Sequence, residues 1–224
     1  TLPAREELDA AGLYVLPGML DCHAHINDPG FTWREDLPHA SEAAAVGGVT
    51  TLIDMPLQNT PPLTSADAFA NKLAVFEGRS LVDYALWGGL VTDNTAELAG
   101  MDAAGAVGFK AFIAPVSLGY SSVDMGLARE ALFRIKAFGG LAGFHCEDHA
   151  LICAGEAKAK AGGGTRRAFL DSRPVVAEVI ATANVIELAR ETGARVHICH
   201  VSHPRVAELV RRAQADGLSV TGET

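Results

Sequence analysis

Hydrophobic residues along this chain gather in short runs, and segments with helical character separate the runs. Seven runs have the length and β-branched content of buried strands, at residues 13–20, 49–55, 82–91, 107–113, 141–145, 195–201 and 218–221. Capping residues and helical periodicity mark the segments between them, at 37–46, 65–77, 94–104, 124–138, 148–160, 174–192 and 204–215. Strands that are apolar throughout are buried on both faces. The alternation therefore predicts an α/β fold with a parallel sheet covered by helices.

The number of strand–helix units and the lack of one glycine motif indicate which kind of α/β fold to expect. Seven strand–helix units without a Rossmann glycine fingerprint favour a TIM (β/α)8 barrel, and an open doubly wound sheet is the alternative. The sequence given stops at Thr224, shortly after the seventh predicted strand begins at residue 218, so the eighth unit is missing from it. We therefore expect a barrel that is truncated before strand eight.

Composition and charge argue against several function classes. The 27 acidic residues outnumber the 18 basic ones, and no basic stripe suited to nucleic acid is present. No apolar run reaches the roughly 18 residues of a membrane span, so no membrane partner is expected. The four cysteines form no C-x-x-C pair, which fits reduced thiols in a cytosolic protein. Three of them adjoin histidines and are interpreted as small buried hydrophobes rather than zinc ligands: Cys22, Cys146 and Cys199.

Candidate chemistry begins with His23 and His25, at the end of the first predicted strand. Residues i and i+2 of a strand share a face, so the two imidazoles lie side by side, as in a metal site. The plain alternative is two polar residues at a strand end. Lys110, His145 and His200 fall late in the fourth, fifth and sixth predicted strands. In a barrel all five meet on one rim, where active sites lie. The remaining histidines scatter and are interpreted as structural or solvated: His39, His149, His197 and His203.

Lys110 has two interpretations, because a charged amine inside an apolar strand is costly unless it is paired or modified. It can reach the rim or pair with a carboxylate such as Glu147. Alternatively, burial and nearby metals can lower the pKa of a lysine amine, and the neutral amine can add CO2 to become a carbamate. A lysine carbamate is an anionic ligand that can bridge two divalent cations.

Longer motifs resemble those of the cyclic amidohydrolases of the amidohydrolase superfamily, and among them the allantoinase subfamily. They are PGMLDCHAH at 17–25, NDPG at 27–30, GGVTTLIDMPL at 47–57, VGFK at 107–110, HCE at 145–147, SRP at 172–174 and HICHVS at 197–202. These motifs cover essentially the whole chain in family order. The dihydroorotases and hydantoinases are further relatives.

The resemblance implies a distorted TIM barrel with two divalent metal ions, expected to be zinc. By that analogy His23 and His25 hold one ion, His145 and His200 hold the other, and carboxylated Lys110 bridges them. A hydroxide between the metals would attack the ring amide carbonyl. The family also uses an aspartate at the end of strand eight, a position absent from this sequence. We therefore expect an incomplete site here and assign activity to the intact parent.

The resemblance also implies a domain organisation. Residues 1–16 would be the end of an N-terminal β-sandwich segment with its lead-in strand, and residues 17–224 the incomplete barrel. The expected protein is a cytoplasmic homo-oligomer, a dimer or a tetramer.

The expected substrate is a small cyclic amide or ureide. Dihydroorotases carry an arginine for the substrate carboxylate two residues past the second histidine, where this chain has Asn27. Hydantoinases and dihydropyrimidinases usually place an oxyanion-stabilising tyrosine where this chain has Pro115. The motifs at 27–30 and 54–57 favour ring opening of allantoin to allantoate, a step of purine catabolism. Allantoinases usually follow Pro-Gly with arginine, whereas Phe31 stands here.

The residues expected to contact the substrate are Asn27, Gln58 and Asn59. For Gln58 and Asn59, ordinary turn polarity is the alternative. Two further alternatives concern function: a hydantoinase-, dihydropyrimidinase- or dihydroorotase-like hydrolase, and a non-catalytic scaffold homologue or inactive fragment. Retention of all five metal-site residues argues against the scaffold, because a scaffold needs none of them.

Overall fold

The computed structural model describes residues 6–116 and 119–224, and every statement on structure below concerns these ranges. The strands are β1 (Met19–Ala24), β2 (Val49–Asp54), β3 (Asp83–Leu86), β4 (Gly88–Gly89), β5 (Phe109–Phe112), β6 (Leu141–His145), β7 (Arg195–Ile198) and β8 (Val220–Gly222). The helices are α1 (Leu37–Val46), α2 (Ala66–Phe76), α3 (Leu98–Ala103), α4 (Met125–Ala137), α5 (His149–Ala161), α6 (Arg166–Asp171), α7 (Val175–Thr192) and α8 (Pro204–Ala215).

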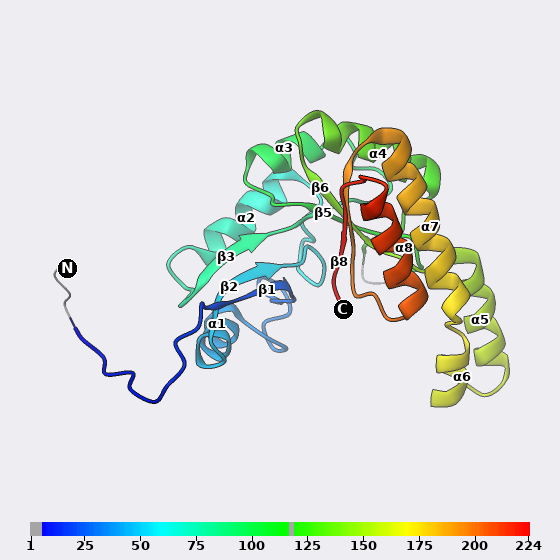
Figure 1. Ribbon diagram of the computed structural model, residues 1–224. Coiled ribbons are helices and arrows are strands. Elements are labelled where there is room, and N and C mark those ends of the chain that lie inside the picture. Colours follow the sequence, from blue (N-terminus) through cyan, green and yellow to red (C-terminus); the bar gives the residue numbers. More distant parts are fainter. Residues whose placement is uncertain (1–5, 117–118) are drawn as a thin grey trace.

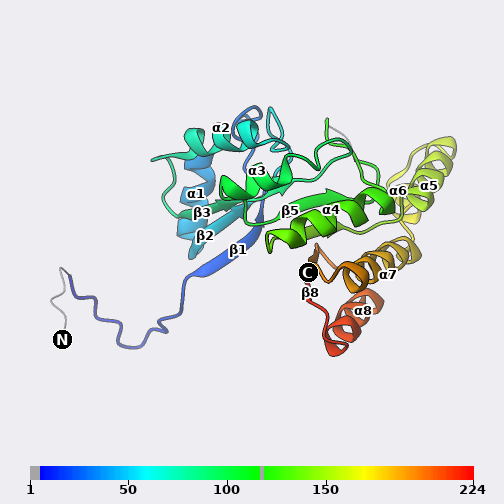
Figure 2. The ribbon, with the colours of Figure 1, turned by 90° about the horizontal axis from the view of Figure 1, so that it is seen from above.

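All strand pairs are parallel, in the orders β1-β2-β3 and β4-β5-β6-β7-β8. The strands form a curved wall, and the helices lie along its outer side (Figures 1 and 2). Helices α2, α3, α4, α7 and α8 contact one another in that order around this outer side. The parallel α/β prediction is confirmed. β1 and β8 stand at the two ends of the strand order, and no backbone pairing joins them in the described ranges.

The third predicted strand is interrupted at Trp87, which separates β3 from β4. Its amide still donates to the Asp54 carbonyl over 2.9 Å, so the wall continues through this residue. The indole is buried where two neighbouring positions lack a side chain, Gly108 just before β5 and Gly143 in β6. A Cβ on Gly108 or Gly143 would lie 2.5 Å or 2.9 Å from the ring. Glycine at 108 and 143 thus makes room for one large aromatic group inside the curve.

Capping residues stand at the start of α2 and at the end of α7, whereas α3 was predicted from residue 94 but begins only at Leu98, without a side-chain cap. Ser65 accepts a hydrogen bond from the Ala68 amide at the start of α2, and Gly193 ends α7 in the left-handed conformation. On α4 the buried positions follow the i, i+3, i+4, i+7 pattern of one helix face: Ala128, Ala131, Leu132 and Ile135. That face contributes to the core against the sheet.

The register of the strands places their carboxyl ends at one edge of the wall. Asp54 pairs with Ala24 on one side and Leu86 on the other, and Phe112 pairs with His145. Ile198 pairs with Gly222 at the far end. Residues that end these strands therefore lie along one rim, as in other parallel α/β folds.

The first predicted strand, at residues 13–20, is wrong for all but its last two residues. Residues 13–18 have no regular structure, and β1 begins only at Met19. Leu13, Tyr14 and Leu16 are 73%, 95% and 77% exposed. Apolar composition alone suggested a strand, but a strand also needs a neighbour to pair with, and no described residue pairs with this segment. In Figure 1 it leads away from β1 as an extended tail.

Residues 161–174 also differ from the prediction. The glycines at 162–164 end α5, and Thr165 then caps a short additional helix, α6, which the sequence did not reveal. Helices α5 and α6 project together beyond the sheet (Figure 1). Across the described residues, no helix combines the length and the apolar character that crossing a membrane requires.

Candidate metal centre

The two histidines of the first motif lie at the rim, as their spacing predicts. β1 ends at Ala24, so His23 is in the strand and His25 follows it. Their ring centroids are 5.3 Å apart. The end of β1 and the residue that follows it thus bring the two imidazoles close together.

His145 ends β6, and His200 lies in the turn after β7. The Nδ1 atom of His145 is 3.1 Å from Nε2 of His200, and their ring centroids are 4.6 Å apart. The His200 ring is also 5.5 Å from that of His23. Four imidazoles from distant parts of the sequence therefore form one continuous group across the rim.

Lys110 lies in β5 and is 1% exposed. Its Nζ atom has no hydrogen-bond partner in the described residues and lies 5.1 Å from the ring centroid of Phe112. The Phe112 ring in turn stacks on His145 at 5.0 Å. Glu147, the carboxylate suggested as a partner of Lys110, pairs elsewhere, so that interpretation is wrong. A buried amine without a partner is costly, and carboxylation of the amine together with cation binding would remove this cost.

The electrostatics at His25 and His200 favour the neutral imidazole. Desolvation by the surrounding protein, with smaller effects from His23 and Lys110, lowers the pKa of His25 to about 4. Desolvation, Lys110 and His145 lower the pKa of His200 to about 3. Metal ions bind neutral imidazole. Together with the unpartnered amine of Lys110, this donor set fits two divalent cations.

His145 is held from the side by Glu147. The Nε2 atom of His145 lies 2.7 Å from the carboxylate, which also accepts from Nη1 of Arg173 at 2.9 Å. Arg173 extends the chain to Glu156 at 2.9 Å. Burial alone would raise the pKa of Glu147, but His145 and Arg173 outweigh it and lower that pKa. Arg173 thus connects two carboxylates beside the ring of His145.

The loop after β1 is held by a buried ion pair. The Asp54 carboxylate accepts from the Ile26 amide at 2.6 Å and pairs with Lys72 of α2. The Lys72 ammonium donates to the Ile26 carbonyl at 3.0 Å and to the Asn59 side chain at 2.5 Å. Burial raises the pKa of Asp54 and lowers that of Lys72, and their mutual attraction opposes both shifts. Ile26 lies between His25 and Asn27, so this pair fixes the start of the loop.

The three expected substrate contacts lie in different settings. Asn59 is buried against Lys72, which suits a structural role. Asn27 is also buried, and its amide donates back to the His25 carbonyl over 3.0 Å, while its side-chain oxygen has no partner in the part of the chain described. Gln58 is half-buried and has a positive φ of 63°. Substrate contact by these three residues therefore stays a prediction.

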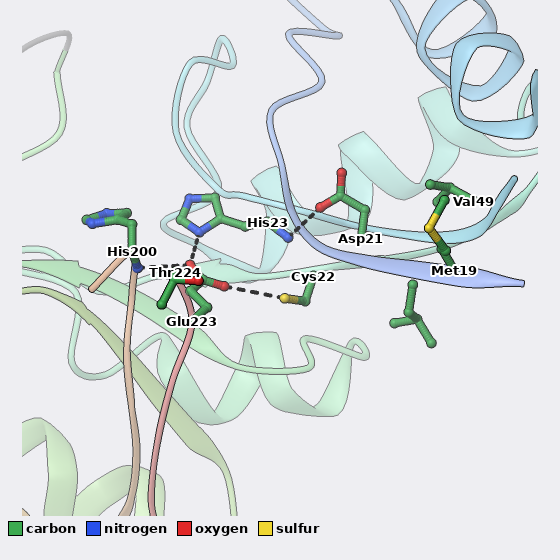
Figure 3. A pocket seen from close by; sticks show the side chains of 9 residues that line it. Met19, Asp21, Cys22, His23, Val49, His200, Glu223 and Thr224 are labelled. Atoms are coloured by element: carbon green, nitrogen blue, oxygen red, sulfur yellow. Dashed lines mark hydrogen bonds and ion pairs between the residues drawn. The ribbon is translucent and has the colours of Figure 1, made fainter. Parts of the chain in front are cut away.

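Glu223 is the site residue that sequence reasoning missed. It follows β8, and its carboxylate bonds to Nδ1 of His23 and accepts from the Cys22 thiol at 3.3 Å (Figure 3). These residues and His200 line an open cavity of about 520 Å³ between β1 and the end of β8. Burial tends to raise the pKa of Glu223, but the bonds from His23 and Cys22 lower it to about 2. Glu223 belongs to none of the motifs found in the sequence, so these contacts could not be predicted from it.

One prediction about residues beside the site needs correction, and it concerns Cys22. His197, interpreted as structural or solvated, is half-buried, with Nε2 3.3 Å from Glu223 and Nδ1 2.8 Å from the Thr221 hydroxyl, and these contacts agree with a structural role. Cys22 is exposed, whereas Cys146 and Cys199 are buried as expected. Cys22 lies in β1, at one end of the strand order, and lines the open cavity together with Glu223, which explains its exposure. All four cysteines are free thiols.

The loop over residues 113–125 follows β5, and residues 117–118 of it lie outside the described ranges. Pro115 is half-buried. Tyr120, farther along the loop, is buried and donates its hydroxyl to the Lys110 carbonyl at 2.6 Å. The loop thus contacts the backbone of the strand that carries the unpartnered amine.

Comparison with known sequences places this geometry in a family. A sequence model described as dihydro-orotase-like matches residues 12–205. The allantoinase of Streptomyces avermitilis is 39% identical over 225 residues, covering 100% of this chain and 50% of that protein. The allantoinase of Escherichia coli is 38% identical over 228 residues, covering 99% and 50%. The chain spans about half the length of the curated relatives it matches.

Solved structures of hydantoinases are similar to this chain in fold. The L-hydantoinase (dihydropyrimidinase) of Arthrobacter aurescens superposes with a TM-score of 0.93 at 38% identity, covering 100% of this chain and 50% of that chain. A D-hydantoinase (dihydropyrimidinase) of Thermus sp. gives a TM-score of 0.81 at 26% identity, covering 93% and 46%.

Proposed function

The chain belongs to the dihydro-orotase-like family of cyclic amidohydrolases, and on this premise we propose that the protein opens the ring of allantoin to give allantoate. The observation that carries the proposal is the meeting of four imidazoles with an unpartnered buried lysine on one rim. Independent structural histidines would have no reason to gather beside such an amine. Hydrolysis of a cyclic amide needs the activated water that a metal site of this kind supplies.

Two divalent cations are the proposed cofactors. His23 and His25 would hold one ion, His145 and His200 the other, and Lys110, carboxylated by CO2, would bridge them. Bound there, the ions would lower the pKa of a water molecule and polarise the substrate carbonyl. Zinc is proposed because imidazole and carboxylate-type oxygen ligands suit it.

Several neighbouring residues hold the proposed metal-binding side chains in place. Glu147, itself held by Arg173, orients the His145 ring through one nitrogen. The Asp54–Lys72 pair fixes the backbone between His25 and Asn27. Both arrangements fix the positions of the proposed metal-binding residues before any ion binds. Less conformational entropy is therefore lost when the ions bind.

An uncharged substrate is supported by the loop after β1. Asn27 stands where a dihydroorotase-like arginine would be needed, and its amide is occupied by the His25 carbonyl. A substrate carboxylate would therefore lack a cation from this position. Allantoin is a neutral ureide at neutral pH. The TM-score of 0.93 with an L-hydantoinase favours hydantoin hydrolysis as the second candidate function.

The architecture of the whole protein is part of the proposal. We propose that the curved wall belongs to a TIM (β/α)8 barrel, with residues 17–224 in the barrel and residues 1–16 in a neighbouring β-sandwich segment. The exposed apolar residues of 13–16 support the second point, since a neighbouring segment would cover them. A homo-oligomer is supported by exposed Phe133 on α4 and by Val176 and Ile180 on α7. Four free thiols support a cytoplasmic location.

A substrate panel tests the proposed reaction. The full-length protein is prepared with zinc and bicarbonate and incubated with allantoin, hydantoin, dihydrouracil and dihydroorotate, and ring opening is followed by chromatography. Allantoin is expected to give the highest kcat/KM, and dihydroorotate the lowest. Faster hydrolysis of hydantoin would favour the second candidate, and no turnover of any of the four compounds would contradict the enzymatic proposal.

A further inference from the structure

Glu223 follows β8 and contacts both β1 and the turn after β7. One oxygen of its carboxylate bonds to Nδ1 of His23 on β1 and lies 3.3 Å from the backbone amide of His200, after β7. The other oxygen accepts from the Cys22 thiol at 3.3 Å. Figure 3 shows the carboxylate between the two histidines. It therefore connects one proposed ligand of each metal ion.

We propose that Glu223 is a positioning residue that fixes the His23 ring and the His200 backbone for metal binding. The inference rests on the proposed two-metal function, whose ligands it serves. Glu223 is not one of the five proposed ligands, and its role is to position two of them.

The first part of the task is the choice of the nitrogen by which His23 binds. A carboxylate beside Nδ1 stabilises the tautomer that carries its proton there, because an ionised carboxylate can only accept. The Nε2 lone pair is then free for a ligand. Metal-binding histidines commonly donate their other ring N–H to a carboxylate in this way, which also fixes the ring plane.

The second part concerns the turn that carries His200. This residue has a φ of 40°, a left-handed conformation that is unfavourable for a side chain with a Cβ. The amide of Val201 donates to the Glu223 carbonyl at 2.7 Å, and the amide of Glu223 donates to the Ile198 carbonyl at 3.1 Å. Backbone and side chain of Glu223 thus both contact the 198–201 turn and support its conformation.

Glu223 acts through the histidines rather than as a ligand. Its carboxylate is already engaged by His23, by the Cys22 thiol, by the His200 amide and by Nε2 of His197 at 3.3 Å. These contacts occupy both oxygens. A metal ion on this carboxylate would have to displace contacts from three parts of the chain.

The test uses the full-length protein as wild type, Glu223→Ala, Glu223→Gln and the control Glu208→Gln. Glu208 is a carboxylate on α8 that pairs with Arg211 and Arg212 and touches no proposed ligand. Zinc dissociation constants are measured by chelator competition. Circular dichroism and thermal melting confirm that each variant is folded.

Glu223→Ala is expected to weaken zinc binding about 10- to 100-fold, the usual effect of removing such a supporting group. Glu223→Gln should lie between, because its amide oxygen still accepts from Nδ1, and Glu208→Gln should match the wild type. Unchanged zinc affinity in Glu223→Ala would overturn the proposal. Loss of one ion per chain in both Glu223 variants would overturn it too, since that result identifies a direct ligand.

A spectroscopic measurement separates this proposal from the proposed function. In metal-free wild type, nitrogen-15 NMR of the imidazoles should show His23 protonated at Nδ1, and Glu223→Ala should lose this preference. Protonation of wild-type His23 at Nε2 would contradict the positioning role whether or not zinc binds. A wild type with the expected tautomer but no zinc and no turnover would instead contradict the metal-dependent function. The measurement on wild type needs no variant to fold.

Discussion

Lys72 donates a hydrogen bond from inside the protein to the backbone carbonyl of Ile26, over 3.0 Å. The Ile26 amide is held by Asp54, the ion-pair partner of Lys72, so both backbone groups of Ile26 bond to one buried pair. His25 precedes Ile26 directly. An ion pair with both side chains at most 1% exposed therefore determines where this proposed ligand stands.

Breaking this pair should destabilise the fold. Asp54→Asn leaves a buried ammonium without its counter-charge, and the free energy of unfolding should fall by about 3–5 kcal/mol. Lys72→Met should have a similar effect, and the double variant should lose less than the sum of both. Urea unfolding measures all three. Glu191→Gln, which breaks the exposed Arg129–Glu191 pair, is the control and should change the free energy of unfolding little, because solvent screens this pair. Equal losses in Asp54→Asn and the control would refute the account of this pair.

Removing the amine of Lys110 should remove metal and activity together. Lys110→Ala is expected to lose most bound zinc and at least about 100-fold in kcat/KM, because one ligand bridges both proposed ions. Short carboxylic acids with added zinc should partly restore both. Elemental analysis and the allantoin assay report the result. Lys158→Ala, on the exposed face of α5, should match the wild type. Full zinc content in Lys110→Ala would exclude the bridging role.

Filling the space under the Trp87 indole should strain the wall. Gly108→Ala places a Cβ 2.5 Å from the ring, and Gly143→Ala places one 2.9 Å away. Each should lower the free energy of unfolding by about 1–3 kcal/mol, since the buried indole has little room to move. Gly126→Ala on α4, whose Cβ would meet only the Asp124 side chain at 3.3 Å, should be neutral or slightly stabilising. If chemical denaturation ranked Gly126→Ala as the most damaging variant, the packing argument would fail.

The four free thiols should differ in reactivity. Burial raises the pKa of Cys146 to about 12 and also raises that of Cys199, so neither forms much thiolate at pH 8. Cys153 is exposed and should react first with a thiol reagent. Cys22 is exposed too, but desolvation and Glu223 raise its pKa, so it should react more slowly. Mass spectrometry of the labelled native protein gives the order, and early labelling of Cys146 would contradict it.

The fold was predictable where local pattern and tertiary environment agree. The run 141–145 and the segment 174–192 became β6 and α7 nearly as predicted, because continuous apolar runs are buried in a parallel sheet and capped periodic segments cover it. Leu13 and Tyr14 have equally strand-like character but pair with no described residue. Whether an apolar run becomes a strand depends on a neighbour that local sequence does not specify.

The histidines and Lys110 were predictable because each ends or interrupts an apolar strand, and parallel strands bring such positions to one rim. Lys72 and Glu223 were not. Lys72 reads as an ordinary exposed helix residue, and only the assembled fold places Asp54 and the Ile26 carbonyl around it. Glu223 is 200 residues from His23 in sequence and gains its contact only when the ends of the wall approach each other.

The most direct test of the central claim is the metal content of the full-length protein. Purified wild-type protein, reconstituted with zinc and bicarbonate and freed of unbound ions, is analysed by elemental mass spectrometry beside His23→Ala/His25→Ala and His145→Ala/His200→Ala. The account predicts about two zinc ions per wild-type chain, and at most one in each double variant. A wild type without zinc, or double variants that keep the wild-type content, would contradict the assignment of these histidines to a two-metal centre.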